Sequence, residues 1–130
     1  MNDPLKVLIA GDDHDSADTM ALLLQLHGYD AIGVYDGRQS VVAARTFHPE
    51  VAILDINMPH MNGYDTAVAL RTAHAEATYL VLVAHTAQTH TVEVRRAQQV
   101  GIDFHVEKPI AGDKLCAFIE TIRPRRSVNH

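Results

Sequence analysis

The sequence contains a single cysteine and fewer basic than acidic residues. The only cysteine is Cys116, so no disulfide can form within the chain. Cys116 falls within an apolar helical pattern, and we expect it to be a small core residue. The 11 Lys and Arg residues are outnumbered by 16 Asp and Glu, which gives a formal net charge of −5. This balance argues against a nucleic-acid-binding protein, because contacts with the phosphate backbone need a basic surface.

No long hydrophobic run is present either. The apolar part of the N-terminal stretch MNDPLKVLIAG is too short to span a membrane, and no basic region precedes that apolar part. We therefore expect a cytoplasmic protein without membrane contact. The chain has 130 residues, 47% of them hydrophobic, which suits one domain with a sizeable core. We expect that domain to cover residues 1–123, followed by a short basic C-terminal tail, 124–130.

Strand and helix patterns alternate five times along the chain. Most strand candidates are continuous apolar runs, which is typical of parallel strands covered on both faces. The alternation predicts an α/β protein, a flavodoxin-like (βα)5 three-layer sandwich with a parallel sheet in the order 2-1-3-4-5. The strand candidates are 6–10, 31–34, 51–54, 79–84 and 104–106, and the helix candidates are 16–27, 37–47, 64–73, 89–100 and 112–123.

Helix ends and faces give further expectations. Asp15 is a plausible N-cap for the first helix, and Gly28 is expected to stop it. The fourth helix, THTVEVRRAQQV, is polar on most sides. We therefore expect it to be the least firmly packed helix and a candidate for movement.

Charged side chains follow three of the predicted strands. Asp12 and Asp13 come after the first strand, Asp55 after the third and Lys108 after the fifth. Parallel strands deliver the residues that follow them to one edge of the sheet, so we expect these four to meet. Neighbouring carboxylates repel unless a cation compensates, and Mg²⁺ is held by a few carboxylates with positions left for water and phosphate oxygens. The pattern therefore favours phosphate chemistry on an aspartate.

These residues and their surroundings resemble the receiver domain of a two-component response regulator. The matching segments are GDDHD, LDINMPHMNGYD, HTA and EKPI, in order at the strand ends, and the resemblance covers about Lys6 to Ile122. The first helix region is similar to receivers of hybrid histidine kinases, while the chain length resembles a single-domain regulator of the chemotaxis kind.

The resemblance implies that Asp55 is the nucleophile, which accepts a phosphoryl group from a histidine kinase or a histidine phosphotransfer protein. Asp13 and Asp55 would bind Mg²⁺ directly, Asp12 partly through water, and Asn57 through its backbone carbonyl. Lys108 would pair with the carboxylate and then with the phosphoryl group, aimed by a cis bond to Pro109.

The resemblance also implies how phosphorylation is read out. Thr86 would donate its hydroxyl to the phosphoryl group, the small Ala87 would let a backbone N–H approach it, and His105 would follow Thr86 inward as the second switch residue. Histidine departs here from the commoner Tyr or Phe. Asn57 and Gln88 would tune the phosphate lifetime, which we expect to be seconds to minutes.

Signalling without nucleic acid or membrane contacts would pass through proteins. We expect an unknown downstream partner on the surface formed by the fourth helix, fifth strand and fifth helix, and either a monomer or a phosphorylation-linked homodimer. The chain would not be an enzyme beyond its own phosphorylation and dephosphorylation.

Other positions are given structural interpretations. Gly11 replaces a larger apolar residue and would give the acidic loop unusual backbone freedom. His85 replaces an aliphatic residue and is expected to be a core histidine satisfied by a nearby backbone group. Gly63, after Asn62, signals a turn. The nine histidines show no metal-ligand spacing, which favours scattered surface residues.

Three other functions are open. An Mg²⁺-dependent phosphatase with an aspartate nucleophile would need a second aspartate where Asn57 stands. A flavin carrier would need a phosphate loop rich in Ser, Thr and Gly, whereas Asp12 and Asp13 would repel the flavin phosphate. A receiver that acts as a binding module without phosphorylation is disfavoured by the complete set of site residues.

Overall fold

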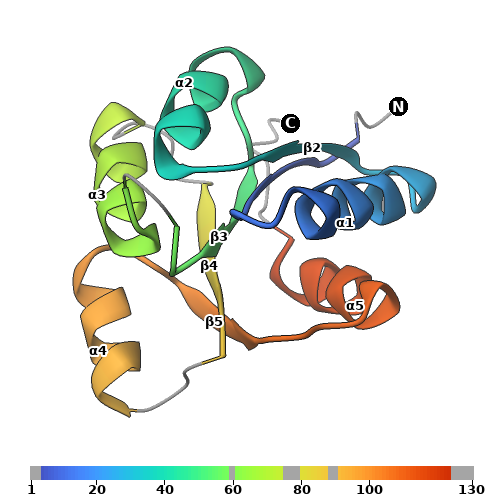
Figure 1. The fold of residues 1–130 in the computed structure, drawn as a ribbon. Helices are drawn as coiled ribbons and strands as arrows, with labels where there is room; N and C mark the ends of the chain where they lie inside the picture. Colours follow the sequence, from blue (N-terminus) through green and yellow to red (C-terminus); the bar gives the residue numbers. More distant parts are fainter. Residues whose placement is uncertain (1–3, 59–60, 75–79, 88–90, 124–130) are drawn as a thin grey trace, which may run out of the picture.

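Strands and helices alternate throughout the computed structural model, which describes residues 4–58, 61–74, 80–87 and 91–123, with the backbone alone for 91–94. The predicted alternation is confirmed (Figure 1). The strands are β1 (Lys6–Ala10), β2 (Asp30–Val34), β3 (Val51–Asp55), β4 (Val81–Thr86) and β5 (Phe104–Glu107). The helices are α1 (His14–Leu26), α2 (Gly37–Phe47), α3 (Gly63–Ala73), α4 (Thr91–Gln99) and α5 (Gly112–Ile122).

The strands form one parallel sheet in the order β2-β1-β3-β4-β5, as predicted. Helices α1 and α5 cover one face and α2, α3 and α4 cover the other, which gives three layers (Figure 1). Each connection returns the chain to the same side, so every strand ends at one edge of the sheet. That edge carries the candidate site.

Two apolar cores lie on the two faces of the sheet. Val7 and Ile9 of β1 pack in the core beneath α1 and α5, whereas Leu8 and Ala10 pack in the core beneath α2 and α3. Successive side chains of a strand point to opposite faces, so a strand covered on both sides must be apolar at every position. This explains the continuous apolar run at the start of the chain.

Helix α1 begins earlier than the sequence predicts. The residue that caps it is Asp13, not Asp15, so that prediction is wrong. Asp13 has extended backbone (φ −83°, ψ 104°), and its carboxylate accepts a hydrogen bond of 3.2 Å from the Ser16 backbone N–H. Gly28 follows the helix with φ 92°, a conformation that suits glycine and that fits the predicted stop.

Helix α4 is anchored at few described points. Between residues 95 and 99 the buried side chain is Ala97, and the Arg96 guanidinium lies 4.3 Å from the centre of the Tyr64 ring. Its ability to move stays a prediction. Tyr79, the first residues of the predicted fourth helix (89–90) and the tail (124–130) lie outside the described residues. None of the helices in the described ranges has the length and apolar character needed to cross a membrane.

An arginine clamp holds the far edge of the sheet. Arg71, near the end of α3, donates hydrogen bonds to the backbone carbonyls of Leu80 (2.6 Å) and Gly101 (3.0 Å from Nε), and it pairs with the Asp103 carboxylate at 2.6 Å. Asp103 also accepts from the Leu82 backbone N–H at 2.9 Å. One planar guanidinium with several donors can join these groups, which lysine cannot. The clamp fixes the beginnings of β4 and β5.

Gly63 marks a close approach between the start of α3 and the end of β3. A Cβ atom there would lie 2.8 Å from both the Asp55 carbonyl oxygen and the Ile56 Cα. We expect Gly63→Ala to destabilise the protein by about 1–3 kcal/mol, because the backbone must shift to admit the methyl group. Urea unfolding measures the change. Gly11→Ala is the matched control, since its nearest new contacts are at 3.9 Å. Equal stability of the two variants would contradict this interpretation.

Candidate functional site

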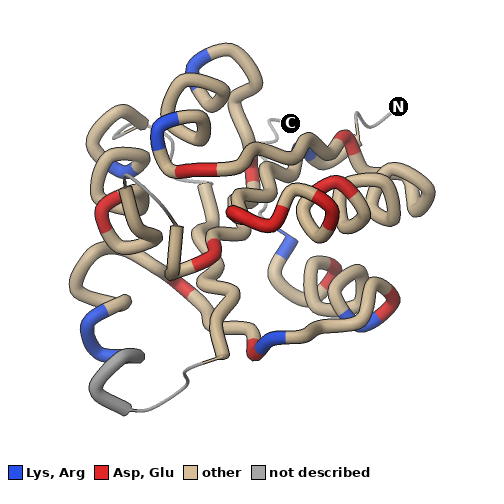
Figure 2. Tube along the Cα trace, viewed as in Figure 1, with Lys and Arg blue, Asp and Glu red and all other residues tan. Residues whose placement is uncertain are grey.

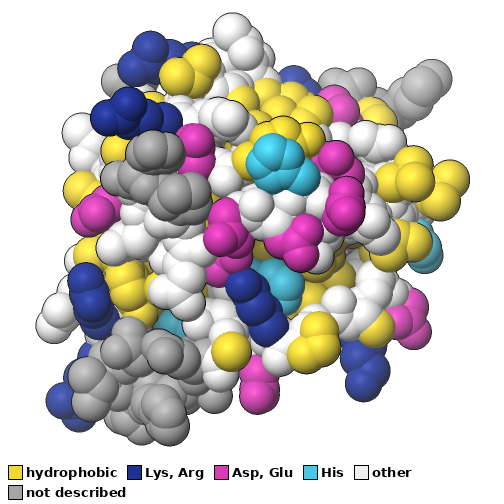
Figure 3. Space-filling model, viewed as in Figure 1, with side chains coloured by type: hydrophobic (Ala, Val, Ile, Leu, Met, Phe, Trp, Pro, Cys, Tyr) yellow, Lys and Arg dark blue, Asp and Glu magenta, His cyan; other side chains and the backbone are white. Residues whose placement is uncertain are grey.

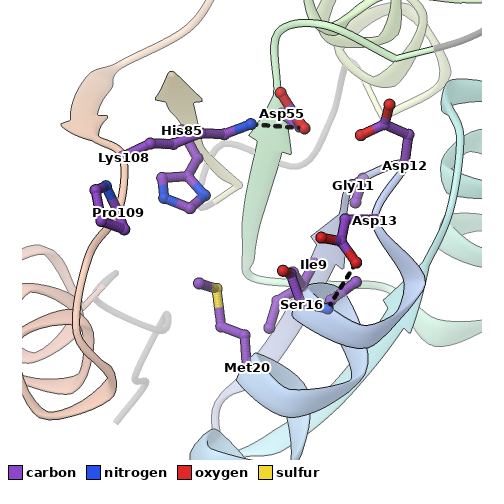
Figure 4. Close-up of a pocket in the computed structure, with 12 residues that line it drawn as sticks. Ile9, Gly11, Asp12, Asp13, Ser16, Met20, Asp55, His85, Lys108 and Pro109 are labelled. Carbon is purple, nitrogen blue, oxygen red and sulfur yellow. Dashed lines mark hydrogen bonds and ion pairs between the residues drawn. The ribbon is translucent and has the colours of Figure 1, made fainter. Parts of the chain in front are cut away.

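Residues from the ends of four strands surround one pocket. β1 and β3 are neighbours in register up to Ala10 and Leu54, so the segments that follow them emerge side by side. The pocket has a volume of about 260 Å³ and contains Asp12, Asp13, Asp55 and Lys108, as the sequence predicts (Figure 4). Acidic segments gather where α1 begins and where β3 ends (Figure 2). The full lining is Ile9, Ala10, Gly11, Asp12, Asp13, Ser16, Ala17, Met20, Asp55, His85, Lys108 and Pro109.

Asp55 ends β3 as a buried carboxylate with two defined partners. Its residue is 6% exposed, its Oδ2 lies 2.8 Å from Lys108 Nζ, and its Oδ1 accepts a hydrogen bond of 3.1 Å from the Asn57 backbone N–H. A carboxylate this deep needs such partners, because burying an unpaired charge is costly. Asp55 is therefore paired and fixed in direction at the floor of the pocket.

Lys108 is aimed at Asp55 from the end of β5, with β4 between the two strands. Its backbone N–H donates a hydrogen bond of 3.0 Å to the Thr86 carbonyl oxygen at the end of β4. The bond between Lys108 and Pro109 is cis, as the family resemblance implies. Figure 4 shows the side chain crossing above His85 to reach the carboxylate.

The adjacent carboxylates of Asp12 and Asp13 are exposed on the opposite wall. Hydrogen bonds from the backbone and side chain of Ser16 lower the pKa of Asp13, so this residue is negatively charged at neutral pH. Its Oδ1 accepts the bond from the Ser16 backbone N–H. On the viewed surface, acidic side chains rim a hollow that holds a basic and a histidine side chain (Figure 3).

The donor set suits a hard divalent cation, although the side chains do not converge on one point. Within the described part of the chain, no group of three or more His, Cys, Asp or Glu side chains is placed to hold a metal ion. The oxygen chemistry nevertheless fits Mg²⁺, since three carboxylates line the pocket against one ammonium group. Asp12 and Asp13 are exposed, so their side chains have room to turn towards Asp55, and Asp13 would give up its bond from Ser16 in doing so.

The other predicted site residues lie at the same edge but outside the pocket lining. Thr86 is 3% exposed at the end of β4, and Ala87 follows it as an exposed residue. Asn57 is exposed and touches Asp55 through its backbone N–H. His105 is half-buried on β5, paired in register with Ala84. Gln88 lies outside the described residues.

Two sequence interpretations need correction here. His85 lines the pocket, and its Nε2 is buried without a hydrogen-bond partner among the described residues, so it is not satisfied by a backbone group. Burial first, and then the charge of Lys108, lower the pKa of His85, which keeps its ring neutral. Gly11 does not use glycine's backbone freedom: the described glycines with positive φ are Gly28 and Gly101.

Sequence reasoning missed the side wall of the pocket. Ser16, Met20 and His85 contribute to it, from α1 and β4. Met20 shares the apolar face of α1, so the helical period could have placed it near the sheet. His85 faces the pocket because it is the register partner of Asp55 on the neighbouring strand. That pairing requires the sheet order and register together.

Comparisons with known proteins agree with this geometry. The chain is 32% identical over 122 residues to the DNA-binding response regulator MtrA of Mycolicibacterium smegmatis, covering 94% of this chain and 51% of MtrA. It thus spans about half the length of this curated relative. It is 30% identical over 120 residues to the transcriptional regulatory protein CreB of Escherichia coli, covering 92% of this chain and 51% of CreB.

Solved structures share the fold. The chemotaxis protein CheY4 of Vibrio cholerae superposes with a TM-score of 0.86 at 24% identity, covering 92% of this chain and 98% of CheY4. The receiver domain of the sensor histidine kinase PA1611 of Pseudomonas aeruginosa, solved with a magnesium ion in its active-site cleft, gives 0.78 at 20% identity, covering 91% and 96%. The family model for the response regulator receiver domain matches residues 7–120. The chain therefore belongs to the response regulator receiver family.

Proposed function

We propose that this receiver takes a phosphoryl group onto Asp55 from a phosphohistidine, with Mg²⁺ bound in the acidic pocket. The observation that carries the proposal is the placement of Asp55: a buried carboxylate at the floor of an open pocket, 2.8 Å from Lys108 Nζ and beside two further carboxylates. A carboxylate kept only for structure would not need this acidic surrounding.

The charges in the pocket support a requirement for a divalent cation. Asp12, Asp13 and Asp55 bring three negative charges and Lys108 one positive charge. The remaining negative charge would repel a phosphoryl group, and one divalent cation balances it. Asp13, Asp55 and the Asn57 backbone carbonyl would hold Mg²⁺ directly, with Asp12 acting partly through water. The ion would neutralise charge on the transferring group, as is general in phosphoryl transfer.

The proposed step forms one bond and breaks one. A carboxylate oxygen of Asp55 attacks phosphorus, the phosphorus–nitrogen bond of the phosphohistidine breaks, and the departing imidazole nitrogen keeps the electron pair and takes up a proton. The product is an acyl phosphate. Lys108 would move its ammonium group from the carboxylate to a phosphoryl oxygen, which requires little motion because the two groups are already in contact.

Readout would begin at the end of β4. Thr86 would turn its hydroxyl to the phosphoryl group, the Ala87 backbone N–H would approach it, and His105 would respond on β5. Since Lys108 N–H is bonded to the Thr86 carbonyl, β4 and β5 are joined at this point. The changed surface of α4, β5 and α5 would bind a downstream protein. Asn57 and Gln88 would set the lifetime of the phosphoryl group.

The partner in phosphotransfer is inferred to be a histidine kinase or a histidine phosphotransfer protein. A second hollow of about 330 Å³ adjoins the acidic pocket between α1 and the segment before α5. Both hollows are lined by Ser16, Met20, His85 and Pro109. The donor imidazole could enter on this side without displacing the sheet. We propose a cytoplasmic signalling protein whose own catalysis is limited to receiving and losing its phosphoryl group.

Covalent labelling tests the proposal. With acetyl phosphate and Mg²⁺, we expect the intact mass to rise by one phosphoryl group, because the pocket supplies both nucleophile and charge balance. Asp55→Ala should abolish the adduct, whereas Asp65→Ala, an exposed aspartate in the first turn of α3, should keep it. An adduct that survives Asp55→Ala would overturn the assignment, as would the absence of any adduct in the unaltered chain.

Thermal unfolding tests the cation site separately. Mg²⁺ at about 100 times its dissociation constant should stabilise the folded chain by about 2.7 kcal/mol, because the ion binds the folded pocket and not the unfolded chain. Asp13→Asn should remove most of this gain. Asparagine also caps helices well, so the variant isolates the charge from the cap.

Asp15→Asn is the matched control for that titration. It removes a carboxylate from the same helix turn but outside the acidic pocket. The Mg²⁺ response of this variant should equal that of the unaltered chain. A response that is lost equally in both variants would mean that Mg²⁺ acts through the general charge of α1 rather than at the proposed site.

A further inference from the structure

Two histidines far apart in the sequence come together at the edge of the sheet opposite to the acidic pocket. His48 is the C-cap of α2 and His74 is the C-cap of α3. Their ring centres lie 6.4 Å apart, with the ring planes at 88°. The packing of α2 against α3 creates this pair.

The helix ends beside the pair offer carbonyl groups with partial negative charge. Both histidines stand where a helix ends, and the last carbonyl groups of a helix carry partial negative charge. His48 occupies the left-handed region (φ 53°) and is exposed, so its ring faces solvent. His74 is half-buried, and its Nε2 is buried without a hydrogen-bond partner among the described residues. An imidazole nitrogen is therefore left without an ordinary protein contact.

The ring separation is close to that of two histidines on one metal ion. A metal lies about 2.0–2.1 Å from a coordinating imidazole nitrogen, which puts it roughly 3 Å from the ring centre. Two rings on one tetrahedral ion then have centres roughly 5 Å apart, so the observed 6.4 Å must close by roughly 1 Å. His48 is exposed, and a rotation of its side chain supplies this movement.

We propose that His48 and His74 bind a divalent transition-metal ion of the Cu²⁺, Ni²⁺ or Zn²⁺ class, with water in the remaining positions. Imidazole suits these ions, whereas Mg²⁺ prefers oxygen ligands. Burial and the neighbouring His48 lower the pKa of His74, so it is in the neutral form that metals require. Two protein ligands give a weak to moderate site with Cu²⁺ bound most tightly.

This site is separate from the one at Asp55. His48 lies just before β3 begins at Val51, and Asp55 ends the same strand. A strand of five residues spans about 16 Å, so the two sites lie at opposite ends of the sheet. The inference does not depend on phosphorylation.

Paramagnetic line broadening locates the ion directly. Amide spectra of the ¹⁵N-labelled chain are recorded with substoichiometric Cu²⁺, in excess Mg²⁺ so that the acidic pocket is occupied. We expect the signals at the ends of α2 and α3, around Phe47 and Ala73, to broaden first. Signals near Asp55 should be unaffected.

Two substitutions decide the assignment. His48→Asn tolerates the left-handed backbone and His74→Gln keeps a polar side chain, and each should abolish the localised broadening. The same spectra show whether each variant is folded, and the exposed His48 position decides alone if His74→Gln is not. His27→Gln, at the exposed C-cap of α1, is the control and should leave the broadening unchanged. Broadening centred elsewhere, or persisting in folded His48→Asn, would overturn the proposal and leave the pair as edge-to-face packing.

Discussion

The contact between Lys108 Nζ and Asp55 Oδ2, at 2.8 Å, is the interaction on which the organisation of the site depends. A carboxylate that is almost fully buried must be paired, and its partner comes from the end of a strand two positions away in the sheet. β3, β4 and β5 must therefore keep their order and register. The Arg71 clamp at one edge and the bond from Lys108 N–H to the Thr86 carbonyl at the other maintain that alignment.

We propose that the same contact links charge to shape. A phosphoryl group on Asp55 would add negative charge near Lys108, which follows β5, and near Thr86, which ends β4. Thr86 is buried, so a rotation of its side chain requires the side chains packed around it to move as well. We propose that this change reaches the surface through His105, a half-buried residue on β5. Histidine at this position differs from the Tyr or Phe that the family resemblance leads one to expect.

Sequence patterns predicted the fold and the centre of the site because both follow from strand ends. Continuous apolar runs required a sheet covered on two faces, and parallel strands brought Asp12, Asp13, Asp55 and Lys108 into one pocket. What the sequence could not predict depends on side-chain packing between distant elements. The orientation of His85 is an example, since it requires the register of β4 against β3.

Sequence patterns also do not show which of two possible structural roles a residue takes. Asp13 lies in the acidic pocket and also caps α1, which moved the start of the helix away from the predicted Asp15. Gly63 read as a turn signal, yet its lack of a side chain lets α3 begin against the backbone of β3. Each depends on how close two chain segments approach, which residue types alone do not reveal.

The most direct measurement of the central claim is to identify the phosphorylated side chain. Borohydride reduces an acyl phosphate to an alcohol, so the chain is treated with acetyl phosphate and Mg²⁺, reduced and analysed by peptide mass spectrometry. We expect the reduced side chain at Asp55 alone. Reduction at Asp12 or Asp13, or no reduced aspartate in a chain that has gained a phosphoryl group, would contradict the account.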